Sequence, residues 1–161
     1  MENVTRKPNR LTEYDYSQTN AYFVTICTSR RRNLFWDVGA VIDRPPQEPK
    51  YTVYGKIADE TIKNIPLHYP AVSVDKYVIM PNHVHLLLQI NTDADGRPMV
   101  APTISTIVQQ MKGAASKRAG FGLWQKGFYD HVIRGYDDYL DIWQYIENNP
   151  AKWAEDEHFP K

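Results

Sequence analysis

The chain has 161 residues, of which 42% are hydrophobic and 12% aromatic, so a folded protein is expected and a disordered chain is excluded. Lysine plus arginine and aspartate plus glutamate number 19 each, and this zero net charge gives no support to nucleic-acid binding, which usually goes with an excess of positive charge. The single cysteine, Cys27, excludes an internal disulfide and a cysteine-rich zinc site, and we expect it to pack in the core.

The length predicts one domain over residues 1–161. The segment Met1–Arg10 is polar and lacks the apolar stretch of a secretory signal. The longest apolar runs are far shorter than the roughly 20 residues that span a bilayer. We therefore expect a cytoplasmic protein with no membrane partner.

The first half of the chain predicts a strand, a loop and a helix. Residues 21–29 are rich in aromatic and β-branched side chains, which favours a central strand. Residues 44–50 contain three prolines, which donate no backbone hydrogen bonds, so this segment is expected to be a surface loop. Isoleucines at helical spacing after Gly55 predict a helix of about ten residues that stops at Pro66. These isoleucines are Ile57, Ile62 and Ile65.

Two strands and a long loop follow. Residues 72–80 and 83–90 have the composition of strands, and the short turn Pro81–Asn82 between them predicts a hairpin. Residues 91–102 are polar and contain glycine and proline, which indicates a loop.

A second helix is predicted after this loop. Thr103 or Ser105 can accept the first backbone hydrogen bonds as a cap, and the helix is expected to run to about Arg118. Its apolar side chains share one face and predict packing against a sheet. They are Ile104, Ile107, Val108 and Met111.

The remaining pattern completes a known arrangement of elements. Residues 128–134 predict a short strand, and Asp137 or Asp138 begins a final helix that runs to Asn148 before Pro150 ends it. The order strand, helix, strand, strand, helix, strand, helix is typical of an α+β ferredoxin-like fold. This fold is a split βαβ with an antiparallel sheet, here with an additional C-terminal helix.

Two histidines provide the first candidate site. His83 and His85 are two residues apart on a predicted strand, so both rings leave the same face while Val84 points to the other. Two neutral imidazoles on one face can converge on a single metal ion. The alternative is an ordinary pair of histidines on a half-exposed sheet face, and the spacing alone does not decide between them.

Tyr145 and Asn149 form the second candidate site. They are four residues apart, so they share a face of the final helix. The amide oxygen of Asn149 could be a third metal ligand, with Tyr145 directed at whatever the metal binds. The alternative is that Asn149 only helps to end the helix and that Tyr145 belongs to the core.

Three segments resemble the signature blocks of the REP-associated tyrosine transposases. They are Tyr-Val-Ile-Met-Pro-Asn-His-Val-His-Leu-Leu-Leu (77–88), Leu-Trp-Gln-Lys-Gly-Phe-Tyr-Asp-His-Val-Ile-Arg (123–134) and Tyr-Ile-Glu-Asn-Asn-Pro (145–150). These transposases belong to the insertion-sequence-200-like group of HUH single-tyrosine enzymes. The order and separation of the blocks also agree, and the resemblance extends from about Ala21 to Trp153, which marks the expected domain core.

The resemblance implies a DNA transposase that cleaves and rejoins single-stranded DNA carrying a hairpin formed by a palindromic repeat. It implies His83 and His85 as metal ligands, Tyr145 as nucleophile and Asn149 as third ligand. Attack by Tyr145 would give a 5′-phosphotyrosine and a free 3′-hydroxyl. Action of Tyr145 within its own subunit and action across a homodimer both stay open.

A divalent cation suits this chemistry. Negative charge on the nonbridging phosphate oxygens must be stabilised while the attacking and leaving oxygens line up. Two imidazoles and an amide are neutral ligands that leave the charge of the ion for the phosphate, which favours Mg²⁺ or Mn²⁺. A tyrosine has a reference pKa of about 10, so Tyr145 needs a nearby charge or base to become a phenolate.

Basic side chains cluster in two segments although the net charge is zero. Residues 30–32 are all arginine, and residues 103–136 carry five basic residues against the single acid Asp130. We expect these cations to contact the DNA backbone. They are Arg30, Arg31, Arg32, Lys112, Lys117, Arg118, Lys126 and Arg134.

Other residues are secondary candidates. His131 could orient a ligand or the phosphate, with a structural role on its strand as the alternative. Tyr129, Tyr136 and Tyr139 compete with Tyr145 as nucleophiles, and the helical register with Asn149, together with the resemblance, favours Tyr145.

Two other functions stay open. A histidine-triad nucleotide hydrolase also alternates histidine with apolar residues, but its third histidine would fall at Leu87. A non-catalytic protein derived from a transposase would bind DNA hairpins without cutting them. The presence of His83, His85 and Tyr145 weighs against this second alternative.

Overall fold

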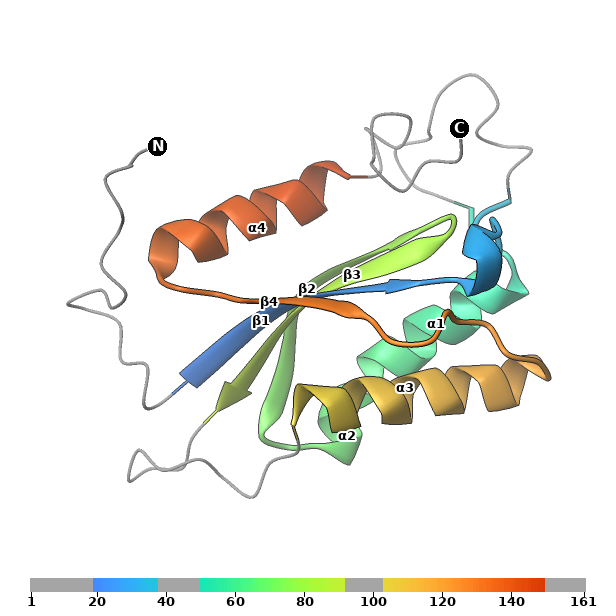
Figure 1. The fold of residues 1–161 in the computed structure, drawn as a ribbon, viewed down its shortest axis with the longest axis horizontal. Helices are drawn as coiled ribbons and strands as arrows, with labels where there is room; N and C mark the ends of the chain where they lie inside the picture. Colours follow the sequence, from blue (N-terminus) through green and yellow to red (C-terminus); the bar gives the residue numbers. More distant parts are fainter. Residues whose placement is uncertain (1–18, 38–49, 92–102, 150–161) are drawn as a thin grey trace.

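The computed structural model describes residues 19–37, 50–91 and 103–149. These ranges contain four strands, four α-helices and one short 3₁₀ turn (Figure 1). The elements are β1 (Thr19–Cys27), η1 (Ser29–Arg31), α1 (Val53–Lys63), α2 (Ile65–His68), β2 (Val72–Met80), β3 (His83–Asn91), α3 (Ile104–Ala119), β4 (Tyr129–Val132) and α4 (Tyr136–Asn148). Almost all of the loops predicted at 44–50 and 91–102, and the helix stop at Pro150, lie outside the described residues.

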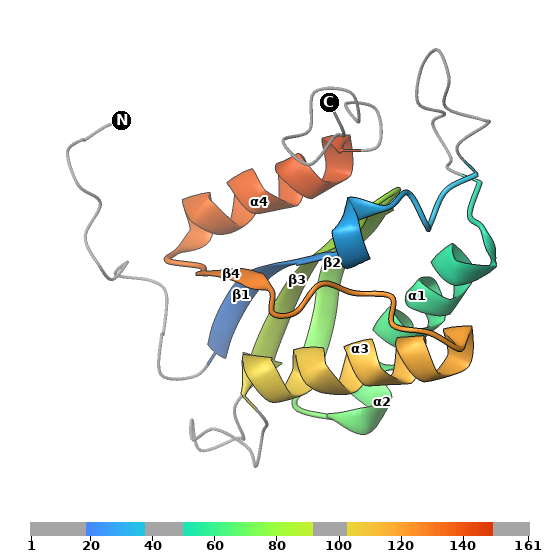
Figure 2. The ribbon, with the colours of Figure 1, turned by 45° about the vertical axis from the view of Figure 1, so that its right-hand side comes forward.

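The four strands form one antiparallel sheet in the order β2-β3-β1-β4. α1 connects β1 to β2, yet β3 lies between these two strands, and this is the split βαβ arrangement. α1, α2 and α3 cover one face of the sheet, whereas α4 lies over the other (Figures 1 and 2). The predicted α+β ferredoxin-like fold with an additional C-terminal helix is confirmed.

The main hydrophobic core lies between the sheet and the layer of α1 and α3. β1 and β3 form the centre of the sheet, and their paired residues Val24 and Leu86 are fully buried. The apolar face predicted for α3 is buried as well, at Ile104, Ile107, Val108 and Met111. Cys27, at the end of β1, is buried as expected. This packing gives the opposite face of β3 a rigid base.

The start of α1 depends on a cap, and its end differs from the prediction. Thr52 precedes the helix, and its Oγ1 accepts a hydrogen bond of 3.1 Å from the Gly55 backbone N–H. The predicted stop at Pro66 is wrong, because α1 already ends at Lys63 and Pro66 lies in the first turn of α2. Proline is tolerated there because the first N–H groups of a helix have no intrahelical acceptor.

The two later helices begin differently. Thr103, one of the two caps predicted for α3, accepts a hydrogen bond of 3.2 Å from the Thr106 N–H. α4 begins at Tyr136, one residue before the predicted start at Asp137, and Gly135 holds the cap position, while Asp138 accepts a bond of 3.0 Å from the Arg134 N–H. Within the described ranges, none of the helices is long and apolar enough to cross a membrane.

A tight turn follows β1. The strand was expected to extend to Ser29, but this residue already belongs to η1. Arg30 and Arg31 have φ angles of 57° and 54°, a left-handed conformation that non-glycine residues seldom adopt. Side-chain hydrogen bonds from Thr28 and Asn82 to backbone carbonyls hold the turn.

Candidate active site

The histidine pair lies at the start of β3, on the sheet face that α4 covers. His83 and His85 project from the face opposite to Val84, and both rings are almost completely buried. Their Nε2 atoms are 3.1 Å apart, and the ring centroids are 4.5 Å apart. The structure therefore brings the two predicted ligands together.

Each imidazole is fixed through its other nitrogen. His83 Nδ1 donates to Asn82 Oδ1 over 2.8 Å, so in the neutral ring the proton is on Nδ1 and Nε2 carries a lone pair. His85 Nδ1 is paired over 2.8 Å with the hydroxyl of Thr25, the residue opposite it on β1. Partners of this kind set the orientation and tautomer of histidines that bind metals. Asn82 and Thr25 were not singled out from the sequence, although Asn82 directly precedes His83.

The spacing of the pair fits two ligands of one cation. Ligand nitrogens about 2.1 Å from a cation and roughly 90–110° apart would lie about 3.0–3.4 Å from each other. The observed 3.1 Å between the Nε2 atoms falls in this range. Within the described residues, no third histidine, cysteine or carboxylate completes a cluster with them. Among the described residues, a further ligand would thus be of another type, such as an amide.

Tyr145 lies beside the pair within the same chain. Its ring centroid is 5.3 Å from that of His85 and 5.9 Å from that of Phe23, with edge contacts to both. The side chain of Tyr145 is 41% exposed, so it is not a core aromatic residue. The phenol is the part of the site that a substrate can reach from solvent.

Asn149 and the other candidate tyrosines lie in environments that differ from that of Tyr145. Asn149 is buried at the end of α4, and its Nδ2 donates to the Tyr145 carbonyl over 3.1 Å. Tyr139 donates from its hydroxyl to Asp75 over 2.7 Å, while Tyr136 and Tyr129 are exposed. Of the tyrosines considered as nucleophiles, Tyr145 makes a ring contact with His85.

An irregularity in β2 anchors the helix that carries Tyr145. The pairing of β2 with β3 slips between Val74 and Lys76, and Asp75 at this bulge accepts the hydrogen bond from Tyr139. Lys76 pairs with Glu147, and its ammonium lies 4.8 Å from the centroid of the Trp143 ring. Sequence reasoning missed this contact, although adjacent Asp75 and Lys76 interrupt an otherwise apolar strand.

His131 is not part of the histidine pair. It lies on β4 opposite Phe23, and its Nε2 is 2.8 Å from a carboxylate oxygen of Asp138 on α4. This contact ties β4 to the first turn of α4. The expectation that His131 orients a ligand stays a prediction.

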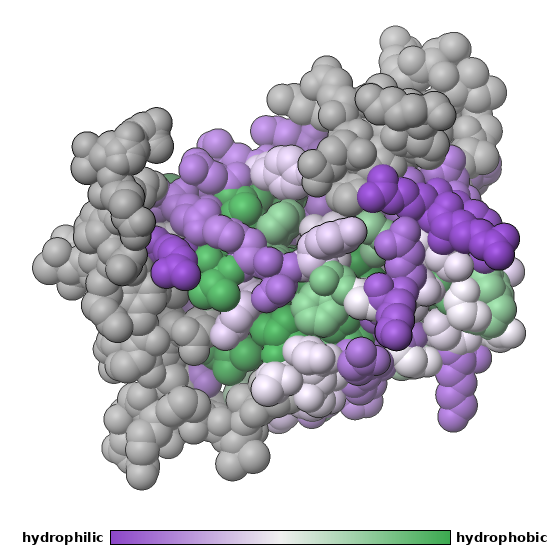
Figure 3. Space-filling model, viewed as in Figure 1, coloured by the Kyte–Doolittle hydropathy of each residue, from purple (hydrophilic) through white to green (hydrophobic). Residues whose placement is uncertain are grey.

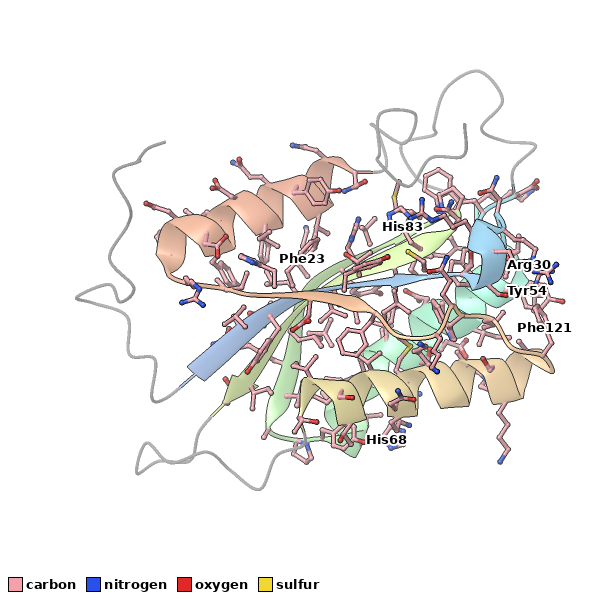
Figure 4. All side chains as sticks on the ribbon, viewed as in Figure 1. Phe23, Arg30, Tyr54, His68, His83 and Phe121 are labelled. Carbon is pink, nitrogen blue, oxygen red and sulfur yellow. The ribbon has the colours of Figure 1, made fainter. Side chains whose placement is uncertain are left out.

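The predicted DNA-binding cations have different environments. Arg30, Arg31 and Arg32 are exposed, and Figure 4 shows Arg30 at the same end of the molecule as His83. Lys112 is instead held by the carbonyls of Gln125 and Gly127 at 2.8 and 2.9 Å, and burial lowers its pKa. Lys112 thereby holds the segment before β4, and its contact with DNA stays a prediction.

The basic residues on and after α3 also differ among themselves. Arg118 forms an ion pair of 2.5 Å with Glu60 of α1, so part of its charge is already neutralised. Lys117, Lys126 and Arg134 are exposed. Their contacts with DNA stay predictions.

Comparisons with known sequences point to transposases. No protein-family model matches the sequence. An uncharacterised protein of Haemophilus influenzae is 32% identical over 171 aligned positions, which cover 94% of this chain and 92% of that protein. Another protein of this organism, provisionally named a REP-associated tyrosine transposase, is 30% identical over 93 positions, which cover 53% of this chain and 52% of that protein.

Solved structures agree with this result. A REP-associated tyrosine transposase bound to a REP hairpin has a TM-score of 0.62 and 22% identity, covering 89% of this chain and 74% of that one. A Deinococcus radiodurans protein provisionally named a transposase has a TM-score of 0.50 and 20% identity, covering 86% of this chain and 95% of that one. The chain therefore has a transposase fold. About half of the chain is thus similar in sequence to one provisionally named REP-associated tyrosine transposase, and its fold is that of another.

Proposed function

We propose that this chain is an HUH-type, single-tyrosine DNA strand transferase that cleaves and rejoins single-stranded DNA beside a hairpin. The observation that carries the proposal is a convergence of three side chains. The Nε2 atoms of His83 and His85 are 3.1 Å apart, and the Tyr145 ring centroid is 5.3 Å from that of His85. The matched transposase that is bound to a REP hairpin supports hairpin DNA as the substrate.

His83, His85 and Asn149 would hold a divalent cation, Mg²⁺ or Mn²⁺. When bound, such a cation supplies positive charge and Lewis acidity beside the nonbridging oxygens of the phosphate. The chain contributes fixed imidazoles, because Asn82 and Thr25 engage both Nδ1 atoms. Asn149 would add its amide oxygen from the end of α4.

Tyr145 would be the nucleophile. Its phenolic oxygen loses a proton and forms a bond to phosphorus, while the bond from phosphorus to the 3′ oxygen breaks. That oxygen takes up a proton and leaves as a 3′-hydroxyl, and the 5′ side stays on Tyr145 as a phosphotyrosine. Attack by a second 3′-hydroxyl reverses these steps and rejoins DNA without ATP. The contact of Tyr145 with His85 supports action within one subunit.

The DNA backbone would follow the exposed cations near the His83 end of the sheet. Arg30, Arg31 and Arg32 lie in the turn that Asn82 holds, and Asn82 also orients His83. This shared partner connects the basic turn to the histidine pair. Lys126 lies on the segment that runs past Cys27, because the neighbouring Gln125 N–H donates to the Cys27 carbonyl over 2.9 Å. Cations from two segments thus flank one end of the site.

A covalent-adduct assay tests the proposal. The protein is incubated with a labelled single-stranded DNA containing a hairpin, with Mn²⁺ or with a chelator, and the products are separated under denaturing conditions. The native chain is expected to form a protein–DNA adduct with Mn²⁺ only. Tyr145→Phe is expected to form none, whereas Tyr136→Phe, a change at an exposed tyrosine of the same helix, keeps the activity.

The same assay separates the alternatives. His83→Ala is expected to abolish the adduct as well, because one of the two converging nitrogens is lost. Binding of the hairpin without any adduct from the native chain would indicate a non-catalytic binder and overturn the proposal. Nucleotide hydrolysis that Tyr145→Phe leaves unchanged would also overturn the proposal, although Leu87 occupies the place of the third histidine that such a hydrolase needs.

A further inference from the structure

Within the described part of the chain, α4 covers only part of the sheet face that bears the candidate site. α4 packs on β2 and β3, and residues of β3 beneath it, including His83 and His85, are buried. Toward the other edge of the same sheet the exposure rises, and all four residues of β4 are exposed. Figure 3 shows hydrophobic and weakly polar residues at the surface between α4 and α3, where β4 runs (Figure 1).

Tyr129 of β4 is aligned with the histidine pair across the sheet. It is opposite Thr25 of β1, and Thr25 is opposite His85 of β3. Residues paired in this way project from the same face, so the Tyr129 and His85 side chains share one row. Two strand spacings of about 4.8 Å place Tyr129 about 10 Å from His85 along this row.

The ring of Tyr129 has no structural use that the described residues show. It is 60% exposed, and its side chain makes no hydrogen bond or ring contact with the described part of the chain. Other tyrosines differ, since Tyr77 is bound to Asp59 and Tyr139 to Asp75. An exposed aromatic ring beside a DNA-cleaving site is a surface on which an unpaired base can stack.

We propose that Tyr129 is a stacking platform for an unpaired base that neighbours the phosphodiester cleaved at Tyr145. The inference rests on the proposed strand-transfer function and deepens it. Exposed Lys126 lies three residues before Tyr129, and Asp130 projects from the opposite face, being paired with Val24. The carboxylate of Asp138 on the face of Tyr129 is paired with His131. Tyr129 would thus act on substrate position and not as a nucleophile.

A second copy of the chain is the competing occupant, because β4 is the edge strand of the sheet. Pairing between edge strands would use the outer backbone groups of β4. This strand has only four residues and contains a charged side chain, features that disfavour edge-to-edge pairing. The exposed ring of Tyr129 projects from the sheet face, which is where a base and not a strand would bind.

Binding measurements can separate the contribution of a stacked base to the affinity from that of the other DNA contacts. All variants carry Tyr145→Phe, so that no cleavage occurs, and they are titrated in Mg²⁺ with a fluorescent DNA hairpin bearing a single-stranded thymidine flank. A second probe has the same flank with abasic sites in place of the thymidines. The test variants are Tyr129→Ala and Tyr129→Phe, and Tyr136→Ala is the matched control, since Tyr136 is 63% exposed and lies at the far end of α4.

Tyr129→Ala is expected to weaken binding of the thymidine probe roughly 5- to 100-fold, as loss of one stacked base does, and to leave binding of the abasic probe unchanged. Tyr129→Phe and Tyr136→Ala should bind both probes like the parent. Equal affinity of Tyr129→Ala and Tyr136→Ala for the thymidine probe would overturn the inference while leaving the proposed function intact. An equal loss of affinity of Tyr129→Ala for both probes would also overturn the inference. So would a molecular mass of Tyr129→Ala in solution that differs from that of the parent. Failure of the parent to bind either probe would overturn the proposed function itself.

Discussion

Removing one hydroxyl group is predicted to disturb the position of the nucleophile. Tyr139→Phe deletes the 2.7 Å hydrogen bond by which α4 is tied to Asp75 in β2. A hydrogen bond to a charged group contributes about 1.5–3 kcal/mol. Burial of Ile146, the one fully buried side chain of α4, contributes a similar amount of roughly 1.5–3 kcal/mol. The partly exposed pair of Lys76 and Glu147 adds only about 0–1 kcal/mol.

The lost bond is therefore comparable to the other single contacts that hold α4 on the sheet, to which the partly buried side chains of Ile142 and Trp143 also contribute. At about 1.4 kcal/mol per factor of ten, its removal is expected to lower the equilibrium constant for docking of α4 on the sheet by roughly 10- to 100-fold. The adduct rate is expected to fall by the smaller factor by which the docked fraction falls. Tyr77→Phe is the matched control. It removes a similar bond of 2.5 Å, from Tyr77 to Asp59, which ties β2 to α1 on the opposite face.

Adduct rates and hydrogen exchange along α4 would be measured for both variants. Faster exchange in α4 and a slower adduct rate are expected for Tyr139→Phe only. The thermal midpoints of the two variants should be comparable, because the deleted bonds are similar. Equal adduct rates for Tyr139→Phe and Tyr77→Phe would refute the view that the Asp75 contact positions Tyr145.

Four further predictions concern stability. Gly113→Ala should add about 0.5–1 kcal/mol to the free energy of unfolding and raise the thermal midpoint, because the new Cβ lies in a helix interior and meets nothing within 4 Å. Gly55→Ala should remove about 1–3 kcal/mol and lower the midpoint, because its Cβ would clash with the Phe35 carbonyl oxygen. Shifts of the opposite sign would contradict these two predictions. Trp36→Phe should cost about 1–3 kcal/mol in urea unfolding, since the indole N–H donates over 2.7 Å to a buried β2 carbonyl. Burial and the bond to Asp59 raise the pKa of Tyr77 above its ordinary value of 10.0. The unfolded chain therefore loses this proton first, and the free energy of unfolding should fall as the pH rises above 10. The fall should be smaller in Tyr77→Phe, and an equal fall would show that Tyr77 does not contribute to it.

Period-two patterning was enough to predict the hairpin and the place of its histidines. Residues 72–80 form β2 as predicted, and β3 begins at His83. Because side chains alternate along a strand, the spacing of His83 and His85 already required a shared face. The helical register of Tyr145 and Asn149 was equally local. These features depend on positions close in the chain, which a sequence displays directly.

Contacts between distant segments could not be predicted in this way. The bulge at Asp75 depends on a register slip between β2 and β3, and neither strand shows such a slip by itself. The hydrogen bonds of Lys112 depend on where the Gln125 and Gly127 carbonyls lie relative to α3. Thr25 becomes the partner of His85 because β1 lies beside β3, although 60 residues separate them in the chain. Each of these contacts is decided by tertiary packing.

Locating the DNA on the protein after reaction tests the central claim most directly. The native chain would be reacted with hairpin DNA and Mn²⁺, the adduct digested with protease and nuclease, and the modified peptide sequenced by mass spectrometry. A nucleotide attached through its 5′-phosphate to Tyr145 is the predicted result. Attachment to Tyr129, Tyr136 or Tyr139, or DNA cleaved with no covalent product, would contradict the assignment of Tyr145 as the nucleophile.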